Sequence, residues 1–90
     1  MRIIQMNPAL RRALERLGII PGSPAAKRIV AEINKLAGTE TLPTPDDVED
    51  IMPPVRHVWS HAVPTTGYVV LYTFNAELLT AWSVRVRPPT

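Results

Sequence analysis

The order of the secondary-structure elements constrains the fold of this chain most. The last third is rich in β-branched and aromatic residues and is divided by turn residues, and two amphipathic helical segments precede it. We predict strands over Arg56–Val63, Gly67–Phe74 and Leu78–Arg87. Because the links between them are short, they should form an antiparallel meander. Helices laid on one face of this sheet give an α+β domain in two layers.

Both predicted helices begin with the same signal, a capping side chain followed by proline, in Asn7-Pro8 and Ser23-Pro24. Gly18 and Gly38 follow as C-terminal stops. The first helix is therefore predicted over Pro8–Leu17, and a helical hairpin should result. The expected apolar stripes are Leu10, Ala13, Leu14 and Leu17 in the first helix and Ile29, Val30, Ile33, Leu36 and Ala37 in the second.

The remaining segments complete a single domain over residues 1–90. Met1–Met6 is β-compatible and is predicted as a short first strand. Residues 39–54 form an acidic, proline-rich connector with one helical turn, which Thr44 caps and Pro45 begins. Asp46 and Asp47 would then lie at the positive end of that turn.

The composition of the 90 residues limits the class of protein. The chain has room for one hydrophobic core. No apolar run approaches the ~20 residues of a membrane span, and the first residues are too short and polar for a signal peptide, so we expect a cytoplasmic protein. Cysteine is absent, which excludes disulfides and thiolate metal sites. With only two histidines, we expect no metal and no cofactor.

The charges fall into three blocks. Residues 1–37 carry seven basic and two acidic side chains, residues 38–55 carry five acidic and none basic, and residues 56–90 carry three basic and one acidic. Such asymmetry is common in proteins that bind nucleic acid and also a partner protein. The alternative is that the acidic connector neutralises the basic helices. Candidate nucleic-acid contacts on the helices are Arg11, Arg12, Arg16, Lys27 and Arg28, which could equally keep the helices soluble.

The final strand ends in two arginines. Alternation places Ser83, Arg85 and Arg87 on one face, and Trp82, Val84 and Val86 on the other. Guanidinium groups stay charged and offer fixed bidentate donors for phosphate, which makes RNA a leading candidate partner.

The first strand of the meander holds the other candidates for chemistry. His57, Trp59 and His61 share one face, with Arg56 at the start of the strand. Histidine titrates near neutrality and could act as acid or base, but a structural role is the alternative for both histidines. Trp59 and Trp82 are expected in the core or at an interface, because large aromatic side chains dominate small cores.

The chain resembles the RelE/ParE superfamily of bacterial toxins. The resemblance rests on Asn7-Pro8-Ala9-Leu10 at the first helix, on the Gly-Tyr-Val-Val-Leu-Tyr run at 67–72, on the ending Ser83-Val84-Arg85-Val86-Arg87, and on the order of elements, β-α-α-β-β-β. It implies a toxin held inactive by a partner antitoxin. RelE-like members cut messenger RNA on the ribosome, whereas ParE-like members inhibit DNA gyrase without such cleavage.

For a ribonuclease, the resemblance implies that Arg87 stabilises the reacting phosphate, with Arg85 as the alternative, and that His61 and Arg56 assist. Two positions depart from the ribonuclease pattern. Val69 stands where the family commonly has arginine after Gly-Tyr, and Arg56–Val63 contains no lysine. A non-catalytic inhibitor of a protein target, or an adaptor that binds another chain through its sheet edge, therefore remains an alternative.

Overall fold

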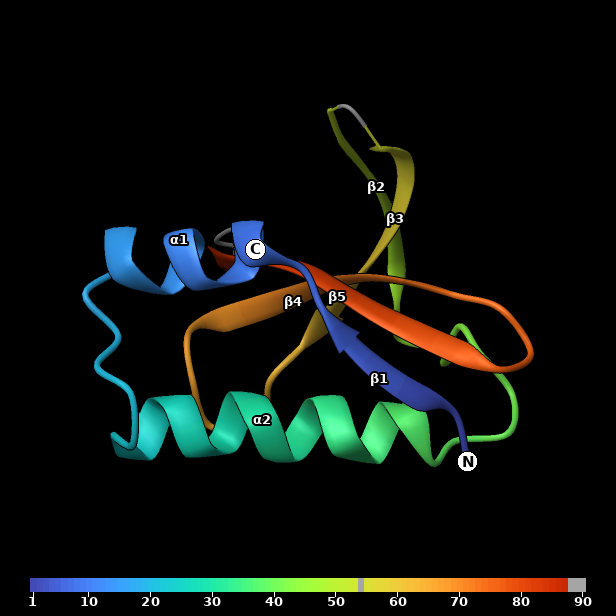
Figure 1. Ribbon diagram of the computed structural model, residues 1–90, viewed down its shortest axis with the longest axis horizontal. Coiled ribbons are helices and arrows are strands. Elements are labelled where there is room, and N and C mark those ends of the chain that lie inside the picture. The colour runs from blue at the N-terminus through green and yellow to red at the C-terminus, as the bar shows by residue number, and fades with distance from the viewer. Residues whose placement is uncertain (54, 88–90) are drawn as a thin grey trace.

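The computed structural model describes residues 1–53 and 55–87, and the side chains of Val55 and Arg56 lie outside that description. Two helices and a five-stranded mixed sheet make an α+β protein, which confirms the predicted class (Figure 1). The elements are β1 (Ile3–Met6), α1 (Pro8–Arg16), α2 (Pro24–Ala37), β2 (Val48–Met52), β3 (Val55–Ala62), β4 (Tyr68–Phe74) and β5 (Leu78–Val86).

The two helices begin as their capping residues predict. The Asn7 side chain accepts a hydrogen bond from the Ala9 N–H at 2.9 Å, and the Ser23 hydroxyl accepts one from Ala26 at 3.3 Å. The apolar stripes face the core with one exception, because Val30 is 43% exposed. Within the described residues, neither helix has the length and apolar character needed to cross a membrane.

The strand order in the sheet is β1-β5-β4-β3-β2. The antiparallel meander β3-β4-β5 is confirmed, and β1 adds to β5 in parallel. The connector turns once at residues 44–47, where the Asp47 N–H donates to the Thr44 carbonyl at 3.0 Å, but this is not the predicted helical turn. Val48–Met52 forms strand β2, which was not predicted, and pairs with β3. A paired edge strand satisfies the backbone groups of this segment better than a single helical turn, which leaves most of its N–H and C=O groups without partners.

One face of the sheet carries the core. Side chains from both helices pack there against Val70, Tyr72, Leu79, Ala81 and Val84. Tyr68 and Phe74 lie on the same face of β4, as alternation predicts. The hydrophobic effect of burying these side chains is the main stabilising term in a domain of this size.

The second face of the sheet is not the open cationic surface that the sequence suggested. Val58, Val69 and Leu71 are buried, and so is Ser83, which was expected beside the arginines. A β-bulge in β5 also changes the face on which the predicted residues lie. Leu71 pairs with Ser83 and Tyr72 pairs with Ala81, so Trp82 is the extra residue. The Trp82 indole N–H donates to the Thr73 hydroxyl at 2.8 Å, on the face opposite Tyr72. The prediction that Trp82 and Val84 share one face is therefore wrong.

The β2–β3 hairpin stands out from the rest of the sheet (Figure 1). Strands β2 and β5 are three positions apart in the strand order, which corresponds to about 14 Å in a flat sheet. Nevertheless, Arg85 of β5 donates hydrogen bonds to Asp50 and Ile51 of β2. The sheet must therefore curl enough to bring the hairpin over its second face.

Candidate functional site

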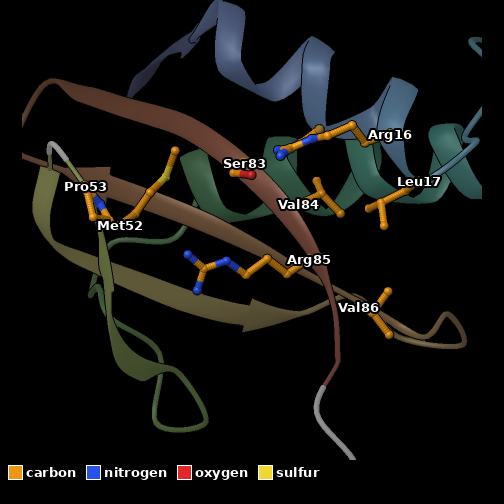
Figure 2. A pocket seen from close by; sticks show the side chains of 9 residues that line it. Arg16, Leu17, Met52, Pro53, Ser83, Val84, Arg85 and Val86 are labelled. Atoms are coloured by element: carbon orange, nitrogen blue, oxygen red, sulfur yellow. The ribbon is translucent and has the colours of Figure 1, made fainter.

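Helix α1 lies along the part of β5 that β1 leaves unpaired. Strand β1 pairs with β5 only between Leu78 and Ala81, and α1 begins directly after β1. A cleft of about 500 Å³ opens between α1, the end of β5 and the β2–β3 hairpin (Figure 2). We call it the α1–β5 cleft, and it is lined by Ala13, Arg16, Leu17, Met52, Pro53, Ser83, Val84, Arg85 and Val86.

The α1–β5 cleft combines positive charge with apolar surface. Arg16 extends from α1 and Arg85 from β5, with Ser83 and Val84 between them (Figure 2). Leu17, Met52 and Val86 supply much of the apolar lining. Arg16 forms no ion pair with any residue in the described part of the chain, so its charge is available to a ligand.

Arg85 is engaged within the molecule. Its Nη1 lies 2.9 Å from Oδ2 of Asp50, and its Nη2 donates to the Ile51 carbonyl at 3.3 Å. The carboxylate is held in place because its other oxygen accepts a hydrogen bond from the Ile51 N–H at 2.8 Å. The guanidinium predicted to hold phosphate therefore binds a carboxylate and a peptide carbonyl of its own chain.

His61 belongs to a second polar group, on the helix side of the sheet. Its Nδ1 lies 2.6 Å from Oδ1 of Asp47, and its Nε2 lies 2.9 Å from Oε1 of Glu32 on α2. Oδ2 of Asp47 accepts a hydrogen bond from the Tyr72 hydroxyl. Each ring nitrogen of His61 therefore lies within hydrogen-bond distance of one carboxylate. We call these four residues the His61 network.

Burial and hydrogen bonding set the ionisation of this network. Burial alone opposes ionisation of Asp47, but hydrogen bonds from Tyr72, His61 and Thr44 outweigh it and lower the pKa of Asp47 below its ordinary value. Burial and the neighbouring Asp47 carboxylate raise the pKa of Tyr72 well above its ordinary value. Asp47 is thus an anion and Tyr72 a neutral donor, which is the arrangement that the hydrogen bond requires.

The structure separates the predicted catalytic residues. His61 pairs with Val70, whose side chain points to the helices, whereas Arg85 pairs with Val69 on the opposite face. His61 and Arg85 therefore lie on opposite faces of the sheet, and the structure does not bring these two predicted catalytic residues together. The His61 side chain is only 14% exposed and both of its ring nitrogens are occupied, which indicates a structural role.

The other predicted catalytic residues lie apart from the network. Arg87 follows the end of β5, is exposed, and donates its backbone N–H to the Gly67 carbonyl at 2.6 Å. Arg56 lies in β3, but its side chain is outside the described part of the structure. His57 is exposed, with Nδ1 at 3.5 Å from Oε1 of Glu49.

The predicted nucleic-acid contacts do not form one surface. Arg16 lines the α1–β5 cleft, Arg12 and Arg16 line a shallower hollow along α1, and Arg11 pairs with Glu15 at 3.6 Å. On α2, Arg28 donates to Thr65 in the β3–β4 turn. Lys27 borders a separate apolar groove between the helices.

Sequence reasoning missed Met52 as part of the cleft, Asp50 as the partner of Arg85, and Glu32 and Asp47 as parts of the network. Val48–Met52 carries no apolar–polar alternation that would predict β2, and the nearby Thr44-Pro45 suggested a helix start. No local signal marks the contact of Glu32 with His61, which is 29 residues away in sequence.

Comparison of the chain with protein-family models, with curated proteins and with solved structures finds no match. A function for this chain therefore has to be argued from its own residues and from their arrangement.

Proposed function

We propose that this chain is a toxin-like protein of the RelE/ParE type that binds a protein target through the α1–β5 cleft and does not cleave RNA. The order of elements supports the proposal in part, since one strand and two helices precede antiparallel strands that end in arginines, although β2 adds one strand to the expected order β-α-α-β-β-β. The proposal includes a partner antitoxin and action in the bacterial cytoplasm.

The residues that line the cleft favour binding over catalysis. Cleavage of RNA by its own 2′-hydroxyl requires proton transfer at two oxygens as well as stabilisation of the charged phosphate. Arginine supplies the stabilisation but does not exchange protons near neutral pH. Among the described residues that line the cleft, none is a histidine, a carboxylate, a lysine or a tyrosine. This cleft is suited to holding an anionic and partly apolar partner.

Two further positions support the same choice. His61, the residue expected to move protons, is held by two carboxylates on the other face of the sheet. Val69, which replaces the family's arginine after Gly-Tyr, is buried against the second face. Neither residue offers a group to a substrate in the cleft.

A ribosome-dependent ribonuclease is the second candidate, and Arg87 favours it. This arginine is exposed immediately after β5, beside Val86 of the cleft wall and hydrogen-bonded through its backbone to Gly67. It keeps the position that the resemblance assigns to the phosphate-stabilising arginine.

Controlled expression in a bacterium tests both candidates. We expect growth arrest without new cuts in translated transcripts, measured by primer extension. Arg16→Ala should relieve the arrest, whereas Arg11→Ala, on the same helix but outside the cleft, should not. Arrest with cuts inside codons would establish the ribonuclease instead, and normal growth would contradict both candidates and favour an adaptor.

A further inference from the structure

The contact between Arg85 and the β2–β3 hairpin indicates what the α1–β5 cleft binds. Arg85 holds an aspartate carboxylate and the carbonyl of the next residue. Together these are an acidic side chain and the backbone carbonyl of the residue that follows it, presented by an extended strand. The hairpin thus occupies Arg85 in the way that an acidic polypeptide from another protein would.

We infer that the α1–β5 cleft binds an acidic, partly apolar polypeptide segment, and that Asp50 is an internal competitor which this segment displaces from Arg85. The inference rests on the cleft being the binding surface proposed above. It adds the chemical class of the partner and a self-inhibitory contact at the same site.

Charge and shape favour a polypeptide over RNA. The two arginines flank apolar side chains of Leu17, Val84 and Val86, which suit leucine-like or valine-like residues of a peptide. Polynucleotide binding commonly uses a cationic track with exposed aromatic side chains for stacking. No tryptophan, tyrosine or phenylalanine lines the cleft among its described residues.

The internal contact is weak enough to be displaced. The side chains of Arg85 and Asp50 are 43% and 40% exposed, and exposed ion pairs contribute little because water screens them. The pairing of β2 with β3 is also irregular between Asp50 and Met52, so no continuous ladder holds the hairpin at this point. A ligand that contacts Arg16 as well as Arg85 gains an interaction that Asp50 does not make.

The test measures binding of a short fluorescent peptide of alternating aspartate and leucine residues by anisotropy, using the full chain. Asp50→Asn should tighten binding about three- to tenfold, since it removes both the competitor and a repulsive charge. Glu49→Gln is the matched control, because Glu49 precedes Asp50 in β2 and contacts His57 instead of Arg85. It should change the affinity less than twofold.

Two results complete the test. In the Asp50→Asn background, Arg85→Ala should remove the gain, and a peptide with asparagine in place of aspartate should bind much more weakly. If the wild type, Asp50→Asn and Glu49→Gln bind the peptide with equal affinity, Asp50 is not a competitor. If Arg16→Ala still abolishes binding in that case, the proposed function of the cleft is unaffected. Binding insensitive to both arginines, or tighter binding of single-stranded RNA than of the peptide, would overturn the assignment of the cleft. Circular dichroism of every variant establishes that it is folded.

Discussion

Asp47 joins three segments of the chain through one buried carboxylate. Its side chain has no exposed surface, and it accepts hydrogen bonds from the Tyr72 hydroxyl, from His61 and from the backbone of Thr44. An ionised carboxylate is stable in such a place only when several donors replace its lost hydration. The connector is therefore attached to β3 and β4 by the partners of a single residue.

The Tyr72 hydroxyl can be tested by Tyr72→Phe. The variant removes one donor and leaves the Asp47 carboxylate underpaired, so the free energy of unfolding should fall by about 1–3 kcal/mol. Urea denaturation followed by tryptophan fluorescence measures this change. Tyr68→Phe is the control, because no described residue hydrogen-bonds to the Tyr68 hydroxyl, and it should stay within about 0.5 kcal/mol of the wild type. Equal losses in the two variants would contradict the role of the network.

Stability should fall at both ends of the pH scale. Because the pKa of Asp47 is lowered in the folded state from 3.8, its contribution is present above that pH and is lost as the pH falls further. Because the pKa of Tyr72 is raised from 10.0, its contribution is present below that pH and is lost as the pH rises above it. Urea denaturation across a pH series should show both losses. Tyr72→Phe should weaken the alkaline loss, and an unchanged alkaline loss would count against the assignment.

The contacts that the connector carboxylates make with residues on the strands could not be predicted from the sequence. Asp47 and His61 are evident from the sequence as ionisable residues, but their contact joins positions 14 residues apart, with most of the β2–β3 hairpin between them. The acidic connector was expected to neutralise the basic helices or to meet a partner. Two of its carboxylates instead contact His61 and Arg85 on strands, because the fold brings β3 and β5 within reach.

At the scale of elements, the link between the helices depends on backbone conformation. Gly18 and Gly22 adopt φ values of +71° and +81°, in the left-handed region that favours glycine. These turns reverse the chain so that the apolar stripes of α1 and α2 both reach the core.

Gly22→Ala isolates this backbone requirement. A Cβ at position 22 would meet no atom within 4 Å, so the expected loss of about 1 kcal/mol comes from the positive φ alone. Gly67→Ala is the matched control: its Cβ also enters open space and its φ is not positive, so it should be neutral or slightly stabilising. Thermal melting compares the two. An equal shift in melting temperature would show that the positive φ is unimportant.

The elements differ in how well the sequence predicts them. Caps and proline are local signals, and both helices end within a residue of their predicted bounds. Strand β2 and the bulge at Trp82 were not predicted, because each is defined by pairing with another strand and not by a signal in its own residues. The cleft could not be predicted for the same reason, since its walls come from three separate segments.

For the whole molecule, β5 is the strand on which the others depend. It pairs with β1 on one side and β4 on the other, and it supplies Leu79, Ala81 and Val84 to the core. A chain truncated after Asn75 keeps both helices and the β3–β4 pair but loses these contacts. We expect no cooperative thermal transition for it by circular dichroism, whereas a chain ending at Arg87 should melt cooperatively. A cooperative transition in the shorter chain would contradict the central role of β5.

The position of β5 has a consequence for synthesis. Translation delivers β1 first and β5 last among the described elements, although the two are neighbours in the finished sheet. Until residues 78–81 emerge from the ribosome, β1 has no partner strand, and the helices lack much of the surface that covers their apolar stripes. The cleft wall at Ser83–Val86 is made in the same final step. An incomplete nascent chain therefore cannot form the α1–β5 cleft, and the protein acquires this proposed binding surface only when synthesis of the sheet is complete.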